Sequence, residues 1–156
     1  MKIINEENLN SIIEFKAENN SPREIFFDYL LSHSCTRKQA LEFLTRKSFS
    51  NPEELLSEAE QMGLVDDLAY AELFADGHLH WGNLKIAYEL KNRGVEKNII
   101  AQALDNVQSE NERAQNLYDS WKNYLDEKKI TARLISRGFS KQAVRALNNN
   151  NDEVNF

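Results

Sequence analysis

Residues 63–104 read GLVDDLAYAELFADGHLHWGNLKIAYELKNRGVEKNIIAQAL and carry the strongest pattern in the chain. Apolar residues recur there at intervals of three and four, which predicts amphipathic α-helices. Asp66 or Asp67 can begin the first helix by accepting backbone N–H groups as an N-cap. Gly82 interrupts the pattern before a second helix, and Gly94 ends that helix where a left-handed backbone is needed. A third helix with its own apolar stripe follows almost at once.

The segments on either side of this unit look like partial copies of it. The end of its second helix, ELKNRGV at residues 89–95, recurs as FLTRKSF at residues 43–49 and as RLISRGF at residues 133–139. The copies are 46 and then 44 residues apart, a period that indicates stacked supersecondary units. In this register the following positions coincide: Ala40, Ile86 and Ile130; Leu44, Leu90 and Leu134; Lys47, Arg93 and Arg137; Ser48, Gly94 and Gly138; Phe49, Val95 and Phe139.

Three segments of the chain carry a family resemblance: GLVDDLAYAELF, WGNLKIAYELKNRGV and ITARLISRGFSKQAVRAL. They resemble the successive signature segments of the RecX family of bacterial RecA regulators. The likeness runs from Glu24 to Leu147 and is clearest in the middle module. It implies an all-α chain of three three-helix modules, elongated and curved, that binds the RecA–DNA filament and restrains it without catalysis of its own.

The middle module departs from the family pattern at several positions. Asn83 stands where family members commonly have a proline after the aromatic and glycine at positions 81 and 82. Three positions that are frequently basic in the family hold other residues here, namely Asp76, His78 and Ala87. The resemblance therefore supports the fold of this module more strongly than direct DNA contact by it.

Helix-start signals set the boundaries of the modules. Capping boxes begin at Ser21, Thr36 and Ser109, and Pro52 opens a helix on which we expect Met62 to face inward. We predict an N-terminal helical extension over residues 1–22, module 1 over 23–65, module 2 over 66–108, module 3 over 109–147 and a disordered tail over 148–156.

Composition agrees with a helical protein outside the membrane. The chain has 156 residues, 41% of them apolar, with only five glycines and two prolines, which favours helix over sheet. No apolar run is long enough to span a membrane and the start lacks a signal segment, so we expect a cytoplasmic protein. The single cysteine, Cys35, cannot form an internal disulfide.

Charge is unevenly distributed along an acidic chain. The formal net charge is −6, yet residues 128–145 contain no acidic residue. Lys129, Arg133 and Arg137 are four apart and form one edge of a helix, either a solvated face or a face for phosphate or acidic RecA surface. The candidate partner-binding residues are Lys128, Lys129, Arg133, Arg137, Lys141 and Arg145, with Lys85, Lys91 and Arg93 as a weaker second contact.

The basic residue shared by the three modules has two interpretations. Lys47, Arg93 and Arg137 would each lie in the last turn of a helix, where a cation complements exposed carbonyl groups. Repeating modules would also present repeating cations to a repeating partner such as a RecA filament. Both interpretations can hold together.

No arrangement typical of an enzyme or metal site is found. His33 lies near Cys35 and His78 near His80, but their spacing fits no closed zinc site. The adjacent aspartates at 66 and 67 follow a glycine-terminated helix and are predicted to be helix caps, as Gly94 and Gly138 are at helix ends. The chain has no phosphate loop or nucleophile motif, so we expect no enzyme, no metal and no cofactor.

We therefore predict a monomeric modulator of RecA that acts by stoichiometric binding to the RecA filament on single-stranded DNA. Module 3 would supply any direct DNA contact. Two alternatives remain open: a non-sequence-specific DNA-binding helical protein that acts without RecA, and a helical-repeat scaffold for protein interactions. A basic groove would favour the RecA modulator or the DNA-binding protein, and an apolar groove would favour the scaffold.

Overall fold

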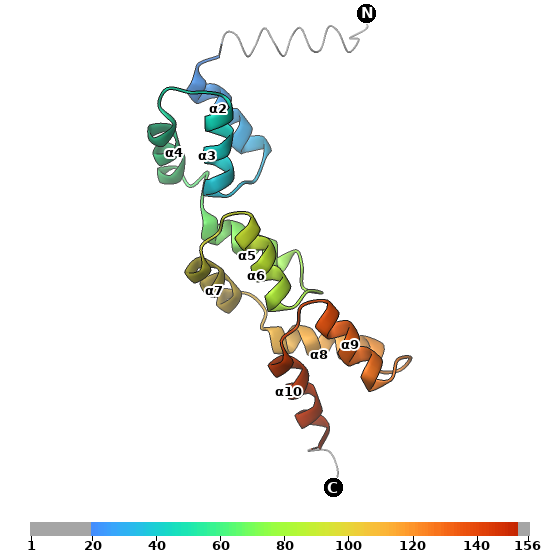
Figure 1. Ribbon diagram of the computed structural model, residues 1–156. Helices are drawn as coiled ribbons and strands as arrows, with labels where there is room; N and C mark the ends of the chain where they lie inside the picture. Colours follow the sequence, from blue (N-terminus) through green and yellow to red (C-terminus); the bar gives the residue numbers. More distant parts are fainter. Residues whose placement is uncertain (1–19, 153–156) are drawn as a thin grey trace, which may run out of the picture. The chain divides into compact units, whose positions relative to one another are not determined.

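The computed structural model describes residues 20–152, with side chains over residues 20–147. Within this part of the chain all regular structure is α-helical and no strand is present, as the sequence predicts (Figure 1). None of the described helices is both long enough and apolar enough to cross a membrane. The helices are α2 (Pro22–Ser32), α3 (Arg37–Arg46), α4 (Pro52–Gln61), α5 (Asp67–Asp76), α6 (Asn83–Asn92), α7 (Lys97–Asn106), α8 (Glu110–Trp121), α9 (Glu127–Ser136) and α10 (Lys141–Asp152).

Residue contacts divide the chain into two units, the first ending at Val65 and the second beginning at Asp66. In the first unit α2, α3 and α4 enclose a core that includes Phe26 and Leu56, both fully buried. The ring of Tyr29 stacks on that of Phe43 with centroids 3.9 Å apart. Aromatic packing between α2 and α3 thus holds this three-helix group together.

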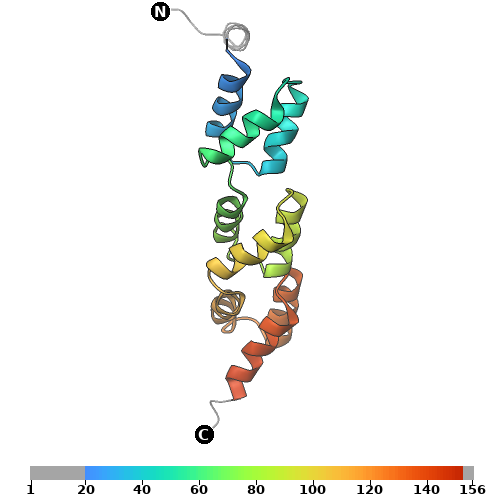
Figure 2. The same ribbon diagram turned by 90° about the vertical axis from the view of Figure 1, so that its left-hand side faces the viewer.

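The second unit contains two further three-helix groups, α5 to α7 in green to yellow and α8 to α10 in orange to red (Figure 2). Ala71 and Ala75 on α5 are buried against α7, where small side chains permit close helix approach. In the last group Trp121 on α8 packs with Leu134 on α9 and Val144 on α10. Each group therefore has its own apolar core, and the fold is an array of three three-helix modules.

The repeat register predicted from the sequence is confirmed by burial. Ala40, Ile86 and Ile130 are all buried and lie on the second helix of their module. The next column, Leu44, Leu90 and Leu134, is fully buried in all three modules. Equivalent core positions of this kind are expected when one supersecondary unit is repeated.

Each second helix ends in a left-handed residue, as expected. The backbone angle φ is 88° at Gly94, 84° at Gly138 and 55° at Ser48. The residue that follows donates its N–H to the buried leucine five positions earlier, as in Val95 N to Leu90 O at 3.1 Å. Ser48 makes the same turn with a Cβ, which carries a conformational cost that glycine avoids.

Most helix starts use the caps anticipated from the sequence. Asp66 Oδ1 accepts from Ala69 N at 3.0 Å, so Asp66 is the N-cap of α5 and Asp67 is its first residue. Thr36 and Gln39 form a complete capping box at α3, whereas Ser21 and Ser109 cap α2 and α8 through the serine side chain. Asn51 is an exception, because its side chain makes no capping bond to α4.

Two expectations require correction. Met62 does not face inward; its side chain is 57% exposed, and Leu56 occupies the core instead. The predicted disordered tail began at Asn148, but α10 continues to Asp152. The N-terminal helix predicted within residues 1–22 lies almost wholly outside the described residues, as do residues 153–156.

Candidate functional site

In the second unit, modules 2 and 3 meet at an interface that we call the joint. Gly82 N donates to Arg137 O at 2.9 Å, and Leu84 N donates to Gly138 O at 3.1 Å. A Cβ at Gly82 would lie 2.1 Å from the backbone nitrogen of Phe139, so no larger residue fits there. The turn before α6 and the turn after α9 are therefore in direct backbone contact.

Glu110, on the first turn of α8, joins the starts of two other helices. Its Oε1 accepts from Asn83 N at 3.0 Å and from Ser140 N at 2.9 Å, and its Oε2 accepts from Ser140 Oγ at 2.7 Å. A carboxylate at helix N-termini satisfies unpaired N–H groups and opposes the positive end of the helix dipole. One side chain thus stabilises α6 and α10 together.

Arg113 lies one turn further along α8 and is only 1% exposed. Its Nη2 donates to Asn83 Oδ1 at 2.6 Å and to Trp81 O at 3.3 Å, while Nη1 donates to Gln108 O. Burial lowers the pKa of this guanidinium, and the Glu110 carboxylate opposes that shift. A buried cation held mainly by carbonyl oxygens fixes the position of the Trp81 turn against α8.

Three cations lie over two tryptophan rings, one ring in module 2 and the other in module 3. Lys85 Nζ is 4.2 Å from the ring centroid of Trp81. Arg133 Cζ and Arg137 Cζ are 5.1 and 5.0 Å from the ring centroid of Trp121, from the same helix end. Such cation–π contacts order long side chains that would otherwise move freely in solvent.

His80 connects the two groups of cations. Its pKa is lowered by partial desolvation and then by the positive charges of Arg137, His78 and Lys85. The Lys85 backbone also lies against the Gly138 turn, where an added Cβ would be 2.5 Å from Lys85 Cβ. Cations of module 2 and module 3 therefore lie near one another at the joint.

We call this group of residues the cation–aromatic face. It is defined by His80, Lys85, Arg133 and Arg137 together with the rings of Trp81 and Trp121.

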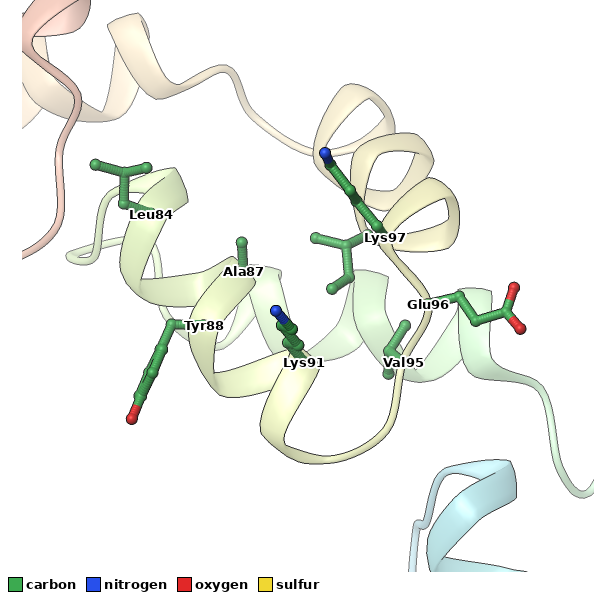
Figure 3. Close-up of a pocket in the computed structure, with 8 residues that line it drawn as sticks. Leu84, Ala87, Tyr88, Lys91, Val95, Glu96 and Lys97 are labelled. Carbon is green, nitrogen blue, oxygen red and sulfur yellow. The ribbon is translucent and has the colours of Figure 1, made fainter.

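The structure separates the other predicted contact residues from one another. Lys91 lines a groove between α6 and α7 (Figure 3). Arg93 is half-buried, pairs with Glu89 at 2.9 Å and lies 4.7 Å from the ring centroid of Phe74. The remaining cations are exposed on α9 and α10: Lys128, Lys129, Lys141 and Arg145.

The edge of α9 that the sequence predicts to face solvent is exposed at Lys129 and Arg133 and half-buried at Arg137. Arg133 and Arg137 are not simply solvated, because both guanidinium groups lie over Trp121. Sequence reasoning also did not identify Glu110 or Arg113. A signal for Arg113 existed, since it falls four residues before Leu117 and eight before Trp121 on the apolar stripe of α8.

Among the described residues, no group of three or more His, Cys, Asp or Glu side chains is placed to hold a metal ion. His78 Nδ1 instead lies 2.6 Å from Phe74 O, and its ring stacks on Trp81 at 4.1 Å. The two histidines of module 2 therefore lie in one aromatic cluster with Trp81 of the cation–aromatic face.

Comparison with known proteins places the chain in a family. Residues 66–104 match the family model described as RecX, second three-helix domain. A "Regulatory protein RecX" from Chlorobium phaeobacteroides is 29% identical over 120 residues, which cover 70% of this chain and 80% of that protein. Its counterpart from Caldanaerobacter subterraneus is 30% identical over 131 residues, covering 78% of this chain and 66% of that protein. The match to the Amycolatopsis mediterranei protein is 35% identical but covers 54% of that relative.

Solved structures agree on the fold. The crystal structure of RecX from Lactobacillus salivarius superimposes with a TM-score of 0.69 at 20% identity, covering 85% of this chain and 95% of the other. A second crystal structure, of regulatory protein RecX, gives a TM-score of 0.63 over 95% of this chain and 79% of the other. On the family model, the relatives and the shared helical fold, this chain belongs to the RecX family of regulatory proteins.

Proposed function

We propose that this protein binds the RecA filament on single-stranded DNA and restrains it, acting in the cytoplasm as a monomer and without catalysis. The observation that carries the proposal is the cation–aromatic face on a protein of this family. An acidic chain that concentrates ordered cations on one surface is suited to an anionic partner, because local potential rather than net charge governs such contacts.

The geometry supports phosphate contact by this face in particular. Lys85, Arg133 and Arg137 are held over aromatic rings, so less side-chain entropy is lost when they bind an anion. Guanidinium groups additionally present several N–H donors in a plane that matches phosphate oxygens. The exposed cations on α9 and α10 would add attraction that decreases with salt.

The test is a RecA ATPase assay on single-stranded DNA into which this protein is titrated. We expect a fall in ATPase activity that saturates at a fixed ratio of this protein to RecA, as stoichiometric binding requires. A matched assay uses the protein with both Arg133→Gln and Arg137→Gln, which should require a higher concentration for the same fall. Unchanged RecA activity at saturating wild-type protein would contradict the proposal.

The second candidate function is DNA binding without RecA. The same face favours it, since phosphate is the anion in either case. A direct measurement of binding to a labelled single-stranded oligonucleotide, with and without RecA, distinguishes the two. Equal affinity in both conditions, with no effect on RecA ATPase activity, would favour the second function.

A further inference from the structure

A groove lies between α6 and α7 on module 2. Its volume is about 540 Å³, and it opens to solvent on module 2 (Figure 3). Its walls are mostly apolar: Leu84, Ala87 and Tyr88 from α6, Val95 from the turn and Ile100 from α7. This volume is in the usual range for a site that accepts a few side chains.

Two large apolar side chains stand exposed at the edge of this groove. Leu84 is 63% exposed and Tyr88 is 64% exposed, and they are four residues apart on one face of α6. Neither belongs to the apolar core of module 2. An adjacent pair of this kind, backed by a hollow, is typical of a surface that receives anchor side chains of a partner helix.

The charges around the groove select the kind of partner. Lys91 follows Leu84 and Tyr88 on the same face of α6, and Lys97 begins α7 on the opposite wall. In Figure 3 the Glu96 side chain points away from α6 and from Lys91. The rim is therefore positive over an apolar floor.

We propose that this groove binds an amphipathic helical segment of a partner protein, with apolar anchors on one side and carboxylates beside them. The anchors would contact Leu84 and Tyr88, and the carboxylates would contact Lys91 and Lys97. No residue that lines the groove belongs to the cation–aromatic face, so the inference goes beyond the proposed function and does not depend on it.

Other occupants fit less well. Two copies of this chain related by a twofold axis would bring Lys91 and Lys97 of both copies together, which like-charge repulsion opposes. Nucleic acid would meet a floor that is mostly aliphatic instead of a ring with a cation over it. An apolar anchor on an acidic helix satisfies both the floor and the rim.

The experiment uses the full-length protein and three fluorescein-labelled helical peptides, without RecA or DNA. The first peptide carries leucine and phenylalanine at helical spacing among glutamates. The second keeps these anchors but has lysine for glutamate, and the third keeps the glutamates but has serine for the anchors. Fluorescence anisotropy gives the affinity of each, and amide chemical shifts show where the peptide binds.

We expect the first peptide to bind with a Kd of roughly 100 μM or tighter and the other two at least tenfold more weakly. Tyr88→Ala should weaken binding of the first peptide by about tenfold, as truncation of an anchor contact does. The double change Lys91→Glu and Lys97→Glu should remove its preference over the lysine peptide. Tyr124→Ala, which truncates another exposed tyrosine of the same unit, is the matched control and should leave binding unchanged.

Three results would overturn the inference. One is equal affinity for the acidic and basic peptides, and another is equal loss in Tyr88→Ala and Tyr124→Ala. The third is concentration-dependent self-association that Tyr88→Ala abolishes, which would show that a second copy occupies the groove. Because RecA is absent from this experiment, its failure is distinct from a failure of the proposed function.

Discussion

The second helices of the modules begin in two different ways. Thr36 caps α3 through its own hydroxyl, and Asp126 caps α9 by accepting from Lys129 N at 2.8 Å. Gly82, at the corresponding position before α6, has no side chain and makes no capping bond. Glu110 of the next module instead accepts from the N–H of Asn83, the first residue of α6.

The difference shows that one position in a repeat can serve either its own helix or the joint between modules. At Gly82 close approach to Phe139 excludes a Cβ, and therefore excludes every residue that could act as a cap. Modules 2 and 3 thus share a helix cap, and the cation–aromatic face depends on the same joint.

The largest effect is expected from Gly82→Ala. The added Cβ would overlap backbone atoms of Gly138 and Phe139, so the joint must shift, and we expect a loss of about 3 kcal/mol in the free energy of unfolding. Urea denaturation measures it. Gly77→Ala is the control, because a Cβ there meets nothing closer than 3.4 Å and should leave stability unchanged or raise it. Equal stability of the two variants would show that the joint does not exclude a side chain at position 82.

Gly138→Ala should cost about 2 kcal/mol, and Gly94→Ala about 1 kcal/mol. Both positions have positive φ, and at Gly138 an added Cβ would in addition lie 2.6 Å from the backbone nitrogen of Lys85. Thermal melts of the two variants measure the difference, which is the contribution of the joint. A larger loss at Gly94 would contradict this account.

Removal of the shared cap by Glu110→Ala should cost about 1.5 kcal/mol, because two helix starts lose an acceptor. Asp126→Ala removes a cap from one helix and should cost about 1 kcal/mol. Glu112→Ala removes the other acidic side chain of the first turn of α8 and should cost only about 0.3 kcal/mol, the size of a helix-dipole contribution. A loss at Glu110 no greater than at Glu112 would show that the cap is not shared.

Much of the fold could be predicted from local sequence because its signals are local. Periodic leucines and isoleucines, capping boxes and the left-handed residue after each second helix identified the three modules. The repeat register then predicted that Ala40, Ile86 and Ile130 share one environment, as burial confirms. These features depend on neighbours three to five residues away.

The joint could not be predicted in this way, since its contacts connect residues far apart in the chain. Arg113 reaches Trp81, and Glu110 reaches both Asn83 and Ser140. The sequence shows that Arg137 is charged, but it does not predict that the guanidinium group lies over the ring of Trp121. The candidate residues named from the sequence are therefore more numerous than the cations of the cation–aromatic face.

The most direct test compares two triple variants of equal charge in binding to RecA on single-stranded DNA at two salt concentrations. One carries Lys85→Gln, Arg133→Gln and Arg137→Gln on the cation–aromatic face. The other carries Lys128→Gln, Lys141→Gln and Arg145→Gln on exposed positions of α9 and α10. Circular dichroism at the assay temperature establishes that both are folded.

We predict that the first triple weakens binding on the order of 100-fold and lowers the slope of log affinity against log salt by about 2, as the loss of three phosphate contacts requires. The second triple should weaken binding less than tenfold, through long-range attraction alone. Equal losses in the two triples would contradict the account, because net charge and not the cation–aromatic face would then determine binding.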